Sequence, residues 1–144
     1  MRKEDGEAFG ASPGLANLDQ LASRAHRAGL PVEVAVEGDP VQLSPGADLA
    51  AYRVVQEALT NALKHARGSR ATVTVRYGRG DVVVQVLDDG VGEAINGTRG
   101  DGGGHGLVGM RERVALYGGE LEAGDRLEGG FAVRARLPVG GLQP

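Results

Sequence analysis

A column of polar side chains follows helical spacing in the middle of the chain. Glu57 and Asn61 are four residues apart, and Lys64 and His65 come three and four residues later, so these side chains share one helical face. Carboxylate and amide oxygens are hard ligands that suit Mg²⁺, which usually leaves part of its coordination shell to substrate phosphates. The spacing therefore predicts a Mg²⁺ and phosphate site. The alternative interpretation is a solvated helical face with a Glu57–Asn61 hydrogen bond.

A second candidate group lies where a run of alternating valines ends, in the segment 88–92 with the sequence DDGVG. Alternation along that run predicts that Asp88 points to the inner face of a sheet and Asp89 to the outer face. An inward carboxylate requires donors, and the exocyclic amine of a purine would supply one. Gly90 and Gly92 would let a flat ring approach the backbone. An ordinary Asp-Gly turn is the alternative.

A third candidate group is the glycine-rich segment 102–110, GGGHGLVGM, which contains G-x-G-x-x-G at Gly104, Gly106 and Gly109. A dinucleotide-binding fold requires a strand directly before the first glycine, and the composition of residues 93–103 predicts a loop. Bare amides at the start of a helix still form an anion site. The segment therefore predicts a phosphate site, with a flexible loop and helix cap as the alternative.

Composition excludes several other classes of protein. The chain has 144 residues, no cysteine, three histidines in unrelated settings and a net charge of -3. Disulfides and thiolate metal sites are impossible, and zinc is not indicated. The charge and the absence of basic runs argue against nucleic acid as a partner. No apolar run reaches the roughly 18 residues that span a bilayer, so we expect no membrane contact by this domain.

Hydrophobic periodicity predicts the elements that must position these groups. The order is αβαββαββ, and the fold class is a two-layer α/β sandwich with a mixed sheet covered on one face by three helices. Residues 14–139 are predicted to form the domain, after a disordered linker or added end (1–13) and before a tail (140–144). The predicted helices start near 15, 48 and 107, and the predicted strands are 32–36, 71–77, 81–87, 120–123 and 131–137.

In this order, the three groups resemble the N, G1 and G2 boxes of the GHKL ATPases, which include gyrase, MutL and the histidine kinases. More narrowly, residues 51–66 (AYRVVQEALTNALKHA), residues 104–114 (GHGLVGMRERV) and Gly118-Gly119 look like sensor histidine kinases whose partner regulators are of the NarL class. The resemblance covers about residues 14–138. It implies the Bergerat ATP-binding fold, with ATP and Mg²⁺ as cofactors.

The resemblance also implies roles for the polar column on the long helix. Asn61 would bind Mg²⁺, and Glu57 would lie at the metal and γ-phosphate end and orient the reacting groups. Lys64 and His65 would contact phosphates. Glu57 and Asn61 are therefore the expected catalytic residues, with Asn61 as the metal ligand.

At the other groups, the resemblance implies that Asp88 binds the adenine N6 amine while Gly90 and Gly92 admit the ring. Residues 93–106 would form a mobile lid over ATP. The family often has Gly-Thr near the last strand, touching the adenine pocket, whereas this chain has Gly130-Phe131, so the threonine contact is not carried over. The lid-end residues expected at the cofactor are Gly104, His105, Gly106 and Leu107.

The phosphoacceptor histidine of such kinases precedes an acidic residue on a dimerising helical hairpin. Here the three histidines precede Arg27, Ala66 and Gly106, so we expect Mg-ATP binding without autophosphorylation. The implied partners are the dimerisation and phosphoacceptor domain of the same kinase and a NarL-class response regulator, and the implied location is the cytoplasm. The alternatives are an anti-sigma-factor-type serine protein kinase of the same fold and a nucleotide-responsive binding module without transfer.

Overall fold

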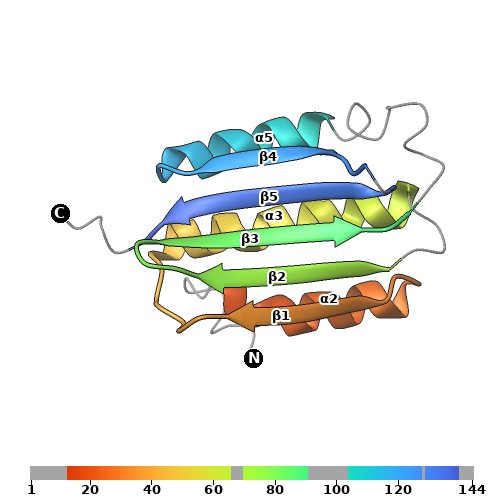
Figure 1. Ribbon diagram of the computed structural model, residues 1–144, viewed down its shortest axis with the longest axis horizontal. Helices are drawn as coiled ribbons and strands as arrows, with labels where there is room; N and C mark the ends of the chain where they lie inside the picture. Colours follow the sequence, from red (N-terminus) through yellow and green to blue (C-terminus); the bar gives the residue numbers. More distant parts are fainter. Residues whose placement is uncertain (1–12, 66–69, 91–103, 128, 140–144) are drawn as a thin grey trace, which may run out of the picture.

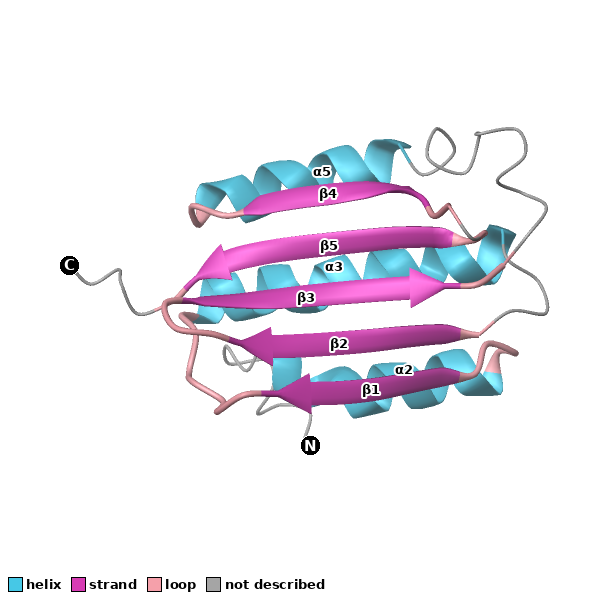
Figure 2. Cartoon of the chain, viewed as in Figure 1, coloured by secondary structure: helices cyan, strands magenta, loops and turns pink. Residues whose placement is uncertain are grey.

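The computed structural model describes residues 13–65, 70–90, 104–127 and 129–139. The elements follow the predicted order, with a short 3-10 helix before the first α-helix (Figures 1 and 2). They are η1 (Leu15–Asn17), α2 (Leu18–Arg27), β1 (Val32–Glu37), α3 (Pro45–His65), β2 (Ala71–Tyr77), β3 (Asp81–Asp88), α5 (Gly104–Leu116), β4 (Glu120–Asp125) and β5 (Phe131–Pro138).

The five strands form one mixed sheet in the order β1-β2-β3-β5-β4. β1 and β2 are parallel, and the other neighbouring strands are antiparallel. All three α-helices lie behind the sheet as it is viewed in Figure 1, on one of its faces. The predicted α/β sandwich is therefore confirmed.

The core lies between the helices and the inner face of the sheet. Burial alternates along β2, β3 and β5, and every second residue of β3 and β5 is buried, as expected for strands with one covered face. In α3 the buried side chains recur at helical spacing and face the sheet. The largest fully buried side chains are Leu30, Val54, Val55, Val73, Val75, Val82, Val84, Val114 and Leu137.

Local hydrogen bonds explain where α3 begins. Ser44 caps the helix: its hydroxyl accepts a bond from the Ala47 N–H at 3.2 Å, and its carbonyl accepts one from the Asp48 N–H at 2.9 Å. Pro45 occupies the first helical position, where its missing N–H costs nothing. The helix therefore begins three residues before the predicted start at Asp48, because the cap and proline, rather than the apolar stripe, set its boundary.

α5 ends in a glycine motif that satisfies its last carbonyl groups. After α5, the Gly118 N–H donates to Ala115 and the Gly119 N–H donates to Val114, both at 3.0 Å. Gly118 has a φ of 81°, a conformation that glycine adopts without strain. A Cβ on Gly46 would collide with the Tyr117 hydroxyl, so the end of α5 lies against the start of α3.

α5 differs from its prediction at its beginning. The apolar pattern starts at Leu107, but the helix starts at Gly104, so the last three residues of the predicted lid form its first turn. Glycine has low helix propensity, and the apolar pattern could not reveal this turn.

Residues 93–103 of the lid, residues 1–12 of the predicted linker and the tail 140–144 lie outside the described residues. In the described part of the chain, no helix is long and apolar enough to cross a membrane.

Candidate functional site

The fold brings the three predicted groups to one end of the molecule, which we call the site end. Figure 1 shows that the last turns of α3, the end of β3 and the first turn of α5 all lie at this end. The β4–β5 turn lies there as well. The opposite end carries the start of α3, the β2–β3 hairpin and the end of α5.

The polar column on α3 lies at the boundary of the core, as its spacing predicts. Glu57 is half-buried, Asn61 is 4% exposed, and Lys64 is exposed. His65 is the last residue of α3, and its side chain lies outside the described part. The alternative Glu57–Asn61 hydrogen bond is not formed, and the Asn61 amide has no hydrogen-bond partner among the described residues.

This buried amide is energetically unusual. Buried polar groups in proteins are nearly always hydrogen-bonded, and leaving one unsatisfied costs about 1–3 kcal/mol. An amide oxygen held at the edge of the core can accept a metal ion or a donor from a ligand. The donor set of Asn61 and the neighbouring Glu57 is therefore suited to Mg²⁺ with bound phosphate.

At the end of β3, strand parity places the two aspartates as predicted. Asp88 is 5% exposed on the inner face, and Asp89 is exposed. Oδ1 of Asp88 accepts a hydrogen bond from the Gly90 N–H at 3.0 Å. Asp89 joins the start of β2, since its N–H donates to the Arg70 carbonyl at 3.2 Å and its Oδ1 accepts from the Arg70 N–H at 2.8 Å. The segment is thus more constrained than an ordinary turn.

The β4–β5 turn contributes residues to this place that the sequence did not single out as site residues. Nη1 of Arg126 donates to the main-chain oxygen of Asp88 at 2.9 Å. A Cβ on Gly130, which has a φ of 98°, would collide with the same oxygen. Phe131 pairs with Asp88 in the β3–β5 ladder and is 6% exposed. The Gly129-Gly130 pair predicted a turn, but no sequence signal placed Arg126 beside Asp88.

The first turn of α5 contains the predicted phosphate-binding residues. The first four N–H groups of a helix lack intrahelical partners and attract anions, and in α5 these belong to Gly104, His105, Gly106 and Leu107. The Leu107 side chain is 7% exposed and belongs to the core, which anchors this turn. Gly92 lies outside the described residues.

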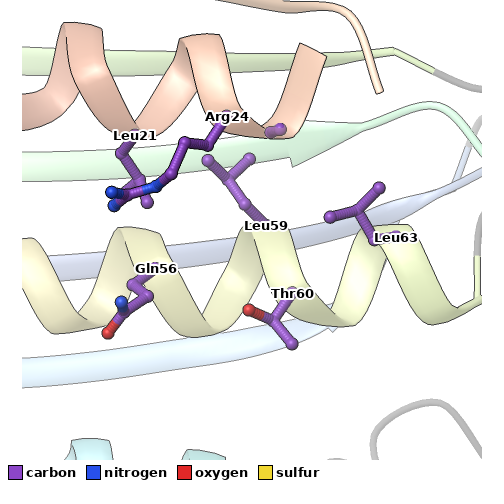
Figure 3. A pocket seen from close by; sticks show the side chains of 7 residues that line it. Leu21, Arg24, Gln56, Leu59, Thr60 and Leu63 are labelled. Atoms are coloured by element: carbon purple, nitrogen blue, oxygen red, sulfur yellow. The ribbon is translucent and has the colours of Figure 1, made fainter. Parts of the chain in front are cut away.

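A separate groove of about 250 Å³ lies between α2 and α3. In Figure 3, Leu59 and Leu63 of α3 point toward α2, and the Arg24 side chain extends into the space between the helices. None of the predicted site residues that the structure describes lines this groove. Its lining is Leu21, Arg24, Ala25, Gln56, Leu59, Thr60 and Leu63.

The arrangement of a two-layer sandwich, a buried asparagine on α3, an inward aspartate at the end of β3 and a helix N-terminus defines a nucleotide-binding class of domain. The model of the histidine kinase-, DNA gyrase B- and HSP90-like ATPase family matches residues 46–141. The chain belongs to this family.

Histidine kinases are among the individual proteins that the chain resembles. The oxygen sensor histidine kinase NreB of Staphylococcus carnosus is 38% identical over 91 residues, which is 61% of this chain and 25% of NreB. The blue-light activated histidine kinase of Erythrobacter litoralis EL346 superposes with a TM-score of 0.69 at 28% identity, covering 91% of this chain and 47% of the kinase. Full-length ShkA in complex with AMPPNP superposes with a TM-score of 0.65 at 25% identity. The match covers 85% of this chain and 28% of ShkA.

Proposed function

We propose that this chain binds Mg-ATP as the catalytic domain of a sensor histidine kinase. The unpartnered amide of Asn61 carries the proposal, because a metal ion or its water shell would satisfy a group that the described protein leaves unsatisfied. Among the described residues, no three histidine or acidic side chains gather to hold a metal. This agrees with Mg²⁺ held by one or two protein ligands together with phosphates.

The remaining site residues take the other parts of the nucleotide. Asp88 accepts a hydrogen bond from the adenine N6 amine, with Gly90 and Gly92 admitting the ring. The main-chain amides of Gly104, His105, Gly106 and Leu107 receive the phosphates at the start of α5, where the helix dipole favours negative charge. Lys64 and His65 add cationic and polar contacts at the end of α3, and Glu57 orients the reacting groups. The AMPPNP in the ShkA complex supports an ATP-like ligand for this fold.

The phosphoryl acceptor of the whole kinase lies on another part of it. The chain spans about a quarter to a third of the curated relatives it matches, so we place the acceptor histidine on a separate dimerisation domain. Transfer requires an acceptor in line with the γ-phosphate. The phosphate then passes to a response regulator of the NarL class, in the cytoplasm. The domain itself occupies residues 14–139.

Titration calorimetry with Mg-ADP on the folded chain tests the binding step. We expect saturable binding that weakens when Mg²⁺ is chelated. Asp88→Asn should reduce ADP affinity by about 1–3 kcal/mol, the range for spoiling one buried polar pair, and leave the fold intact. Heat signals that stay flat with folded protein would reject the proposal.

A second experiment tests the class of kinase. The chain alone should incorporate no acid-labile phosphate from ATP, and adding an isolated dimerisation domain from a related sensor kinase should produce labelling that requires Glu57 and Asn61. Glu57→Ala should reduce transfer more than ATP affinity. Acid-stable phosphoserine on an antagonist protein would instead identify a serine kinase, and stoichiometric phosphohistidine on the chain alone would refute the separate acceptor.

A further inference from the structure

The turn between β4 and β5 holds Arg126 in a fixed position. The Arg126 N–H donates to the Gly130 carbonyl at 2.9 Å, and the Arg126 carbonyl accepts from the Gly129 N–H at 3.1 Å. A side chain that starts from a fixed main chain has less freedom to lose when it makes a contact. The turn therefore holds the main chain of Arg126 in place for a contact with the end of β3.

That contact is with the peptide of Asp88. The guanidinium of Arg126 donates to the main-chain oxygen of Asp88 at 2.9 Å, across a separation of 38 residues. Hydrogen bonds from a charged donor are roughly twice as strong as neutral ones. Because a Cβ on Gly130 would collide with the same oxygen, the turn can approach only with glycine at that position. Arg126 thus ties the end of β3 to the β4–β5 turn.

The carboxylate of the same aspartate is held by the residue that lies two positions after it. Its Oδ1 accepts the Gly90 N–H at 3.0 Å, and the Asp88 side chain is 5% exposed. The Arg126 contact therefore adds to the ladder pairing of the Asp88 main chain with β2 and β5, and the Gly90 contact holds the carboxylate. Loss of the Arg126 contact would remove one restraint on the Asp88 peptide, and we expect the direction of the carboxylate to shift with it.

Phe131 gives Asp88 an apolar neighbour at the end of β3. It pairs with Asp88 in the ladder and is 6% exposed, and it follows Gly130 in the chain, where kinases of the class that the sequence resembles often have a threonine. An apolar neighbour adds contact area but cannot distinguish an amine from a carbonyl. The choice between a base with an amine and a base with a carbonyl at this position then depends on Asp88.

We propose that Arg126 is a positioning residue for base selection. By holding the Asp88 peptide, it directs the carboxylate at the exocyclic amine of adenine and sets the preference for adenine over a purine with oxygen at that position. The carboxylate can accept a hydrogen bond from the exocyclic amine of adenine. A purine with a carbonyl oxygen at that position offers the carboxylate no donor, and the two oxygens repel each other. This inference rests on the nucleotide binding proposed above.

Calorimetry of the whole chain with ADP, IDP and pyrophosphate, each with Mg²⁺, tests the proposal. Arg126→Met should lower ADP affinity about tenfold, corresponding to the loss of one well-directed charged contact, and should reduce the ADP-to-IDP preference by the same factor. Pyrophosphate affinity should not change. Arg126→Lys keeps a charged donor and should restore most of the preference. Arg134→Met, the same change at an exposed site on β5, is the matched control.

The three ligands separate the possible outcomes. A lower melting temperature with an unchanged ADP-to-IDP ratio would make Arg126 merely structural and overturn the inference. Wild-type chain that binds ADP and IDP equally would overturn it while leaving nucleotide binding intact. Wild-type chain that binds no ADP would reject the proposed function and the inference together. If Arg126→Met does not fold, Arg126→Gln replaces it, and an unchanged ratio in that variant overturns the inference.

Discussion

The two ends of the sheet differ in how their polar groups are satisfied. At the opposite end, Ser44 caps α3, and Oδ1 of Asp48 accepts the Leu15 N–H at 2.9 Å. The last carbonyl groups of α5 are satisfied by the amides of Gly118 and Gly119. At that end the helix termini therefore find partners within the chain.

At the site end, the same two helices present groups that call for outside partners. Asn61 of α3 is 4% exposed without a hydrogen-bond partner among the described residues, and the first turn of α5 supplies amides that have no partner within the helix. The chain therefore satisfies the terminal polar groups of α3 and α5 at the opposite end, whereas Asn61 at the site end has no hydrogen-bond partner among the described residues. Substitutions at the site end should therefore reduce nucleotide binding without reducing stability. Substitutions at the opposite end should reduce stability without reducing binding.

Asn61→Leu should show the largest effect and sharpen this contrast. Removing the amide should eliminate the Mg²⁺-dependent part of ADP affinity, about 1.5–3 kcal/mol if its contact has the strength of a hydrogen bond to a charged group. The free energy of unfolding should stay constant or rise, because an unsatisfied buried group is replaced by an apolar one of similar size. Calorimetry with and without EDTA, together with urea unfolding, measures both quantities. Normal Mg-ADP binding by this variant would contradict the assignment of Asn61 to the Mg²⁺ site.

Asp48→Ala should have the reverse effect. Without its carboxylate the Leu15 N–H loses its acceptor, and we expect the free energy of unfolding to fall by about 1–3 kcal/mol. ADP affinity, measured on the folded fraction, should not change. Asp48→Asn keeps an acceptor oxygen and serves as the control for stability. A loss of ADP affinity equal to that of Asn61→Leu would show that the ends are not independent.

The smallest expected effect concerns Tyr77, also at the opposite end. Burial, and secondarily the negative charge of Asp48, raises the pKa of the Tyr77 hydroxyl above its usual value of about 10. The unfolded chain therefore releases this proton at lower pH than the folded chain, and stability falls as pH rises above about 10. Tyr77→Phe should reduce that alkaline loss slightly. Unfolding curves at pH 9 to 11 measure it, and identical pH slopes in both proteins would contradict the assignment.

The parts of the fold that depend on local pattern could be predicted from the sequence. Alternation along β3 placed Asp88 inward and Asp89 outward, because side chains in a strand have a period of two. Helical spacing likewise placed Asn61 at the edge of the core. Family resemblance then supplied the chemical roles that spacing alone left open.

The remainder depended on contacts between distant segments. Arg126 and Asp88 are 38 residues apart, and neither periodicity nor composition relates them. The first turn of α5, starting at Gly104, was hidden for another reason: glycine gives no apolar signal and favours no helix. Burial and hydrogen bonding in the folded chain were needed to find both.

The parallel pairing of β1 with β2 has a consequence for the order of assembly. α3 is the crossover between these strands, so they can pair only after a long segment closes, whereas β2–β3 and β4–β5 are joined by short turns. Closing longer loops costs more chain entropy, and non-local pairs form more slowly. We expect amide protection during refolding to appear in the hairpins before β1. The helix that carries Glu57 and Asn61 would then be secured only after the hairpins have formed, because β1 and β2 pair across the whole of it.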